Sequence, residues 1–319
     1  MTWSKNALKV WQRYLAENET PEQRLHTVAS IIAQAEIKYG ASNNTVETVT
    51  ERFYNLMINK KFLPNSPTLR NIGRSKKLSR AACFVIPIED SMEQIFSALK
   101  TAALIQQFGG GVGANFGQLR PKDDLISSTG GKSSGPVGFM HVFDAAAEEI
   151  KQGGVRRGAW MFSLDVCHPD VEEFIKTEFK NANTSVMVDD VFMKKALKAD
   201  VDSNMFYINP RNMSSPGAFD ASELLKKIAT RAWQRGNPGL LFYDQINQDN
   251  MIPSLGPITA TNPCGEQPLH PNNACNLGSI NLSMYWDKNN HLLLKNDLYQ
   301  DAMTATRFLN NVQVPEQRY

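Results

Sequence analysis

The chain has 319 residues, 42% hydrophobic and 21% charged, which is the composition of an ordinary globular protein with one large domain or two average ones. Its 34 Lys and Arg residues nearly balance 32 Asp and Glu residues, so the net charge of +2 favours neither nucleic acid nor a membrane surface as a partner. No apolar run of about 18 residues predicts a membrane span. Residues 1–15 also lack the apolar stretch of a secretory signal, so we expect a cytoplasmic protein.

Residues 1–62 have the pattern of an all-helical segment. Thr20-Pro21-Glu22-Gln23 combines an N-cap Thr, a Pro at the first helical position and a Gln three residues after the cap. We expect this helix to run to Tyr39 and to end at Gly40, and another helix to cover about residues 45–58. We interpret the segment as a packing layer without a functional site.

After Phe62, short apolar runs alternate with Gly- and Ser-rich turns. We predict strands at 84–86 and 160–166 and helices at 91–108, 137–151 and after Pro169. Strands that alternate with helices indicate an α/β domain. The expected inner side of helix 91–108 consists of Met92, Ile95, Phe96, Leu99 and Leu104-Ile105.

Two glycine-rich stretches could approach a nucleotide. Residues 109–117 fit the loose pattern G-x-G-x-x-A, but a helix precedes them where a dinucleotide site needs a strand, so we predict a sharp turn. In residues 151–158 glycines free the backbone, and Arg156 and Arg157 offer planar forks for phosphate or base edges. The alternative for this second stretch is a solvated basic turn.

Asn262-Pro263-Cys264-Gly265-Glu266 is the sharpest chemical signal in the chain. On an extended loop, alternate residues point the same way, so Asn262, Cys264 and Glu266 could converge on one ligand. Their amide, thiol and carboxylate could bind a hydroxyl, give up a hydrogen atom and take a proton. The alternative is a tight turn with incidental flanking residues.

The chain has four cysteines, and none lies in a CxxC pair or at metal-ligand spacing from a histidine, so we expect no metal site. Cys83 and Cys275 both border predicted strands. A distant cysteine pair in a reducing compartment suggests a transient catalytic disulfide, although either residue alone could be a core residue. We interpret Cys167 as a structural cysteine beside His168.

Several motifs together resemble ribonucleotide reductase catalytic subunits. They occur in the order of that family, and the resemblance spans about residues 13–308. The Asn262-Pro263-Cys264-Gly265-Glu266 form, with the later Cys275-Asn276-Leu277-Gly278, is most similar to class II enzymes, which depend on adenosylcobalamin. The motifs are residues 62–69, the Cys83 strand, residues 152–159, His168-Pro169-Asp170 and residues 262–269.

The resemblance implies a fold and a set of catalytic roles. Residues 63–319 would form the first part of a ten-stranded α/β barrel. Inside it, Cys264 would be the thiyl radical that abstracts the ribose 3′ hydrogen. Asn262 and Glu266 would hold and deprotonate ribose hydroxyls, and Cys83 and Cys275 would supply electrons and become a disulfide. A closed barrel fits this chemistry because it keeps a radical from water and oxygen.

The resemblance also implies two nucleotide sites. The ribonucleotide substrate would contact Ser66, Thr68, Ala82 and Gly265. A deoxynucleoside triphosphate effector would lie near residues 127–134, across a homodimer interface. Its expected contacts are Asp90, Arg120, Lys151, Gln152, Gly153, Gly154, Arg156 and Arg157. On physical grounds alone, Asp90 could equally be a charge at a helix N-terminus.

The chain also departs from the full family pattern. We find no later phosphate loop, no C-terminal cysteine pair and no N-terminal ATP-cone domain, so we expect a truncated fragment or one piece of a split enzyme. Such a piece would be inactive until the missing C-terminal half and a thioredoxin-type reductant were supplied. The alternatives are a class I subunit that depends on a separate radical-generating partner, and a nucleotide-binding chain that has lost catalysis.

Overall fold

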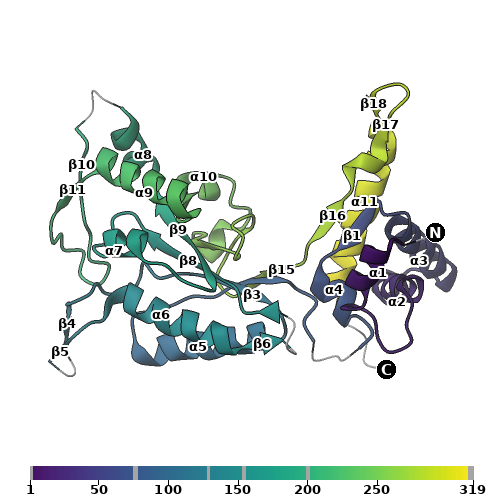
Figure 1. Ribbon diagram of the computed structural model, residues 1–319, viewed down its shortest axis with the longest axis horizontal. Helices are drawn as coiled ribbons and strands as arrows, with labels where there is room; N and C mark the ends of the chain where they lie inside the picture. The colour runs from purple at the N-terminus through teal and green to yellow at the C-terminus, as the bar shows by residue number, and fades with distance from the viewer. Residues whose placement is uncertain (1–2, 75–77, 128–129, 153–155, 199–201, 315–319) are drawn as a thin grey trace. The chain divides into compact units, whose positions relative to one another are not determined.

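The computed structural model describes residues 3–74, 78–127, 130–152, 156–198 and 202–314, which form two compact units. One unit combines residues 1–82 with residues 275–319, and the other consists of residues 83–274. In the first unit, the purple N-terminal helices and the yellow C-terminal helix are neighbours in the fold (Figure 1). We refer to them as the helical unit and the sheet unit.

The helical unit begins as the sequence indicates. Thr20 and Gln23 form the predicted capping box at the start of α2, which continues directly into the 3₁₀ helix η1 before Gly40 ends it with a φ of 81°. The expected helix at about 45–58 is also confirmed. The helices of this unit are α1 (Lys5–Trp11), α2 (Pro21–Ala33), η1 (Gln34–Tyr39), α3 (Asn43–Ile58), α4 (Ser66–Asn71), η3 (Leu282–Tyr285) and α11 (Lys295–Gln313).

Helix α11 completes the core of the helical unit. Its Phe308 ring packs edge-on against Phe53 and Phe62, with centroid separations of 5.1 and 5.3 Å. Glu36 is buried and accepts hydrogen bonds from Arg307 and Asn311 of α11. The strands here are short: β1 (Phe62–Pro64) pairs with β16 (Gly278–Ile280), and β17 (Trp286–Asp287) pairs with β18 (Leu292–Leu293).

A parallel sheet organises the sheet unit. Its strands follow the order β12-β9-β8-β3-β2, and β15 (Asn273–Cys275) lies beyond β2 where the chain leaves the unit. Every pairing among the first five strands is parallel, which confirms the expected α/β class. The bounds of these strands are β2 (Cys83–Val85), β3 (Gly111–Asn115), β8 (Trp160–Asp165), β9 (Ala182–Val188) and β12 (Gly239–Phe242).

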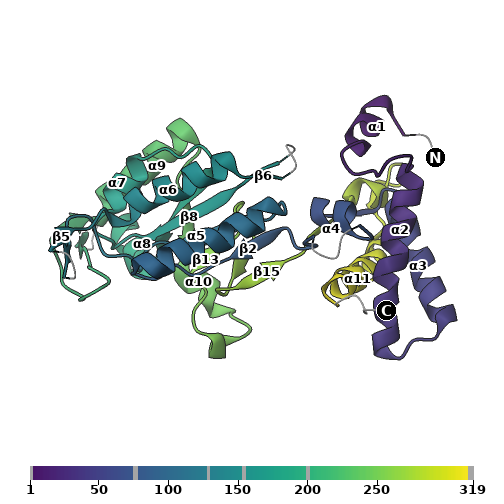
Figure 2. The same ribbon diagram turned by 90° about the horizontal axis from the view of Figure 1, so that it is seen from below.

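Connecting helices cover one face of this sheet and form its core (Figures 1 and 2). Alternate strand residues such as Val112, Phe162 and Val186 point into that core. The opposite face therefore receives the intervening residues, which include Gly111 and Gly113. These helices are α5 (Met92–Gln107), α6 (Gly135–Glu149), α7 (Val171–Lys176), α8 (Asp190–Leu197) and α9 (Ala221–Arg235). Helix α10 (Tyr243–Gln248) follows β12 and has no buried residue.

The predicted position of α5 is confirmed, but part of its predicted inner side is wrong. The helix lies where it was expected and Ser91 caps it, yet Met92, Phe96 and Leu104 are exposed. The stripe that packs on the sheet consists mainly of Ile95, Ala98, Ala102 and Gln106. Small side chains at two of these positions let the helix lie close to the strands.

Short elements complete the sheet unit. Four two-stranded hairpins pair antiparallel in the described residues: β4 (Leu125–Ile126) with β5 (Gly131–Lys132), β6 (Lys151–Gln152) with β7 (Arg156–Arg157), β10 (Asn204–Phe206) with β11 (Ala218–Asp220), and β13 (Ala260–Thr261) with β14 (Pro268–Leu269). A short 3₁₀ helix, η2, spans Pro253–Leu255. Over the described ranges, no helix is both long and apolar enough to cross a membrane.

Candidate functional site

The Asn262-Pro263-Cys264-Gly265-Glu266 motif forms the turn of the β13–β14 hairpin. The Gly265 N–H donates to the Asn262 carbonyl at 3.0 Å, and Gly265 has a φ of +84° that favours glycine. The Asn262 side-chain oxygen also accepts from the Gln267 N–H at 2.9 Å. We refer to residues 262–267 as the cysteine turn.

This geometry corrects the expected extended loop. A turn does not direct alternate side chains to one side, and here Asn262 is fully buried whereas Cys264 and Glu266 are exposed. The alternative of a tight turn describes the backbone correctly. The chemical roles predicted for the three side chains stay predictions.

Two glycines of β3 let the hairpin lie directly on the sheet. A Cβ atom at position 113 would lie 1.6 Å from the Thr261 carbonyl oxygen, and one at position 111 would lie 2.6 Å from the Pro263 ring. The interpretation of residues 109–117 as a sharp turn is therefore wrong for its centre. Gly109 does occupy a turn, with a φ of 86°, but Gly111–Asn115 form a strand whose missing side chains make room for the hairpin.

The buried end of the cysteine turn reaches Cys83 at the start of β2. The Asn262 amide donates to the Cys83 sulfur, with 3.4 Å between nitrogen and sulfur, and both side chains are buried. Two of the five predicted catalytic residues are thus in direct contact. On the far side of the turn, the Asn183 amide donates to the Pro263 carbonyl at 2.8 Å.

Several other predicted site residues belong to the helical unit. Cys275 accepts a backbone hydrogen bond from Ala82 at 3.0 Å, and its proximity to Cys83 stays a prediction because the two cysteines belong to different units. The Ser66 hydroxyl contacts the Tyr14 hydroxyl, whereas the buried Thr68 hydroxyl donates to the Arg80 carbonyl. Their contacts with a substrate phosphate also stay predictions.

The predicted effector residues are only partly described. Asp90 and Arg120 form an ion pair with a shortest separation of 2.9 Å, so the structure brings these two together. Lys151 and Gln152 pair with Arg157 and Arg156 in a two-stranded hairpin. Gly153 and Gly154 lie outside the described residues, as do Ser128 and Thr129 of the companion loop. Binding of an effector by this region stays a prediction.

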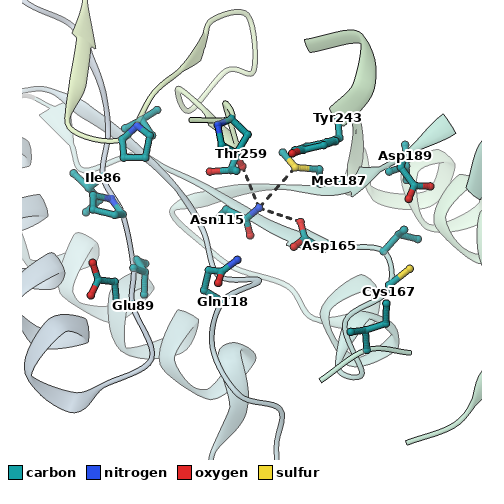
Figure 3. A pocket seen from close by; sticks show the side chains of 18 of the residues that line it. Ile86, Glu89, Asn115, Gln118, Asp165, Cys167, Met187, Asp189, Tyr243 and Thr259 are labelled. Carbon is teal, nitrogen blue, oxygen red and sulfur yellow. Dashed lines mark hydrogen bonds between the residues drawn. The ribbon is translucent and has the colours of Figure 1, made fainter. Parts of the chain in front are cut away.

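A cavity of about 610 Å³ opens at the carboxyl ends of the parallel strands (Figure 3). Its polar lining includes Asn115, Asp165 and Asp189, together with Glu89 and Gln118. The described lining contains no Lys or Arg, and its charged side chains are the carboxylates of Glu89, Asp165 and Asp189. Among the described residues, no group of three or more His, Cys, Asp or Glu side chains could hold a metal ion.

Burial controls the titrating groups beside this cavity. It raises the pKa of the Asp165 carboxyl, an effect that the hydrogen bond from Asn115 opposes. It also raises the pKa of the Cys167 thiol to about 11, so this thiol is protonated at neutral pH and a poor nucleophile. His168 is buried, with Nε2 2.9 Å from the Leu119 carbonyl oxygen, and burial lowers its pKa.

Sequence reasoning missed the residues that hold the hairpin in place: Gly111, Gly113, Asn115, Asp165 and Asn183. A usable signal lay in residues 111–115, where small or polar residues alternate with Val112 and Ala114. That alternation indicates a strand with one apolar face and one face that something else approaches closely.

Comparison with known proteins identifies related sequences for nearly the whole chain. Residues 2–77 match the family model described as the all-alpha domain of ribonucleotide reductase, and residues 81–317 match that of its barrel domain. A vitamin B12-dependent ribonucleoside-diphosphate reductase of Thermoplasma acidophilum is 46% identical over 82% of this chain and 34% of its own length. A protein of the same name from Mycobacterium tuberculosis is 41% identical over 94% of this chain and 44% of its own length. The ribonucleoside-diphosphate reductase large chain of Neurospora crassa is 30% identical over 86% of this chain and 33% of its own length. The chain thus spans less than half the length of these relatives.

Proposed function

Because the chain belongs to the ribonucleotide reductase large-subunit family, we propose that it supplies radical and redox cysteines to an enzyme that reduces ribonucleotides to deoxyribonucleotides. One observation carries the proposal: the cysteine turn lies on the glycine face of β3, with the Asn262 amide at the Cys83 sulfur and Cys264 exposed. A merely structural turn would not need a buried amide placed at a second cysteine.

The proposed chemistry replaces the ribose 2′ hydroxyl with hydrogen. A thiyl radical at Cys264 takes the ribose 3′ hydrogen atom and returns a hydrogen atom to that carbon at the end. Asn262 and Glu266 hold and deprotonate the ribose hydroxyls, and the 2′ hydroxyl leaves as water. Cys83 and Cys275 supply the two electrons and two hydrogens, and become a disulfide. A thioredoxin-type reductant then restores both thiols.

The radical source that we propose is adenosylcobalamin. Two relatives carry vitamin B12 dependence in their names. When bound, the cofactor would supply the radical that removes the thiol hydrogen. The chain's own part is to present that thiol at a fixed place, while the buried Asn262 amide orients the sulfur of Cys83.

We also propose a deoxynucleoside triphosphate effector near Asp90, Arg120, residues 127–134 and residues 151–158. The β4–β5 hairpin precedes α6 and the β6–β7 hairpin follows it, so the two lie at opposite ends of that helix. The Asp90–Arg120 ion pair supports a polar site. A homodimer is proposed because α5 exposes Met92, Phe96 and Leu104, and α6 exposes Val142. Activity should further require the part of the relatives' length that this chain does not span, in the same or another polypeptide.

The proposal is tested by Cys264→Ser in the completed enzyme with adenosylcobalamin and a dithiol. A serine O–H bond is too strong for the hydrogen exchange, so the variant should fold and bind nucleotide but form no deoxynucleotide. Cys83→Ser and Cys275→Ser should still allow loss of the substrate 3′ hydrogen and then fail at reduction. Cys167→Ser is the matched control and should retain turnover.

Product analysis and exchange of a 3′ tritium label separate these outcomes. Turnover by Cys264→Ser would contradict the radical role. Turnover of the unaltered enzyme without adenosylcobalamin, but with a metal-bearing partner subunit, would support the class I alternative. Nucleotide binding without turnover under every condition would support a chain that has lost catalysis.

A further inference from the structure

The Asn115 side chain lies at the end of β3 and joins three parts of the sheet unit (Figure 3). Its amide nitrogen donates to the Thr259 carbonyl at 3.0 Å and to the Asp165 carboxylate at 3.1 Å. Its oxygen accepts from the Gly117 N–H at 2.6 Å. Both the nitrogen and the oxygen of this amide therefore serve to fix its orientation.

The contact with Thr259 matters because Thr259 is the residue before β13, which leads directly into the cysteine turn. Asn183 holds the Pro263 carbonyl in the same way, at 2.8 Å. The side-chain amides of Asn115 and Asn183 thus hydrogen-bond to backbone carbonyls on both sides of Asn262. The second of these carbonyls belongs to the residue immediately before Cys264.

The Asp165 carboxylate orients the Asn115 side chain by accepting a hydrogen bond from its amide. It lies at the end of β8, in the strand next to β3, and accepts from the same amide nitrogen that holds Thr259. Gly117 makes the close approach possible, because a Cβ there would lie 2.4 Å from the Asp165 Oδ2 atom and 2.9 Å from the Asn115 Oδ1 atom. The three residues form a compact cluster that tolerates no added side chain at position 117.

We propose that Asn115, oriented by Asp165, is a positioning residue that fixes the cysteine turn and thereby the place at which Cys264 is presented. The catalytic part of this inference rests on the proposed function. Hydrogen-atom transfer depends steeply on the distance between the reacting atoms. A displacement of about 1 Å far from the chemistry can cost on the order of 10²-fold in rate.

The test compares Asn115→Leu with Asn209→Leu in the purified chain. Asn209 is the matched control because its oxygen also accepts an N–H two residues later, from Arg211, and its nitrogen also donates to a carboxylate, that of Asp124. Within the described part of the chain, these side-chain hydrogen bonds of Asn209 lie away from the hairpin. Amide hydrogen exchange over residues 259–267 and the rate at which iodoacetamide alkylates Cys264 report the order of the turn without any need for activity.

Asn115→Leu should speed amide exchange in residues 259–267 by about tenfold or more. The variant loses the hydrogen bond to the Thr259 carbonyl before the hairpin and the hydrogen bond to Asp165 that orients residue 115. Alkylation of Cys264 should also change, whereas Asn209→Leu should leave both readouts as in the unaltered chain. If Asn115→Leu does not fold, Asn115→Asp replaces it. That variant keeps the acceptor for Gly117 and removes the hydrogen bonds that the amide donates to Thr259, Asp165 and Met187.

In the completed enzyme, Asn115→Leu or Asn115→Asp should lower kcat by on the order of 10²-fold with little change in KM, since Asn115 is not proposed to contact the substrate. Unchanged exchange and alkylation in a folded Asn115 variant would overturn the positioning role, whatever its activity. Faster exchange in Asn115→Leu with an inactive unaltered enzyme would uphold the positioning role and remove the proposed function. The two conclusions therefore fail separately.

Discussion

At positions 111 and 113, the absence of a side chain decides how closely the hairpin approaches the sheet. Gly109, Gly110, Gly111 and Gly113 together suggest a turn, because glycine clusters are typical of turns. The strand is stabilised by its neighbours β2 and β8 and by the hairpin that fills the glycine face. A local sequence pattern cannot show that a glycine is needed because another segment of the chain packs against it.

The first residue-scale prediction is Gly113→Ala. The added methyl group would overlap the Thr261 carbonyl, and the hairpin must shift because backbone cannot swing aside like a flexible side chain. We expect a loss of about 1–3 kcal/mol in the free energy of unfolding, typical of overpacking. Urea denaturation measures it. Gly217→Ala is the control, since nothing lies within 4 Å of its added Cβ, and a comparable loss there would refute the argument.

The site could be predicted only in part at this scale. The resemblance named Asn262, Cys264, Glu266 and Cys83 from their motifs, and the structure brings Asn262 and Cys83 into contact. It could not give the direction of each side chain, because the extended-loop assumption ignored the turn that Gly265 permits. Asn115 went unnoticed because its role depends on a carbonyl far away in the sequence.

At the scale of elements, helix boundaries were predictable and helix faces less so. Thr20, Ser91 and Gly40 act through contacts within a few residues, so their sequence signals suffice. The inner side of α5 depends on what packs there. The strands accept Ala98 and Ala102 at close range and leave Met92 outside, which hydrophobicity alone cannot foresee.

Helix α11 is held to η1 by a buried charge, which leads to a prediction about pH. Hydrogen bonds from Arg307, and next from Asn311, hold the pKa of the Glu36 carboxyl below its ordinary value of 4.5 against the opposing effect of burial. The ionised carboxylate therefore stabilises the fold above that value, and the stabilisation is lost as the pH falls through the lowered pKa of the folded state. Glu36→Gln should lower the free energy of unfolding by about 1.5–3 kcal/mol at neutral pH.

Denaturation from pH 7 downward tests this sign. The difference between the unaltered chain and Glu36→Gln should shrink once the pH drops below the ordinary value of 4.5. Glu173→Gln is the control, because Glu173 pairs with Lys122 on the surface and such pairs contribute about 0–1 kcal/mol. If the difference in free energy of unfolding between the unaltered chain and Glu36→Gln grew as the pH fell, the ionised carboxylate would not stabilise the fold.

For the whole molecule, the division into two units depends on contacts that no local pattern contains. Residues 275–319 return to the N-terminal helices, where Ala305, Phe308 and Val312 join their core. The sequence predicted an N-terminal helical region and an α/β part. It did not predict that the C-terminal helix completes the former, because the pairing spans most of the chain.

This arrangement predicts how the chain responds to truncation after Ala274. The sheet unit keeps its whole core and should survive limited proteolysis as a fragment near residues 83–274. The N-terminal helices lose the α11 face of their core and should be digested rapidly. Mass spectrometry of the digests tests this, with the full chain as the reference. Equal protection of residues 3–74 in both chains would contradict the role assigned to α11.

The discontinuous helical unit also fixes an order of events on the ribosome. Synthesis runs from the N-terminus, so α1 to α4 emerge first and the sheet unit next, whereas α11 emerges only after both. The parts of α2 and α3 that pack on α11 therefore remain uncovered throughout translation of the sheet unit. During that interval the nascent chain depends on whatever shields exposed apolar surface in the cell. The N-terminal helices are synthesised first, yet their core is among the last parts of the protein to be completed.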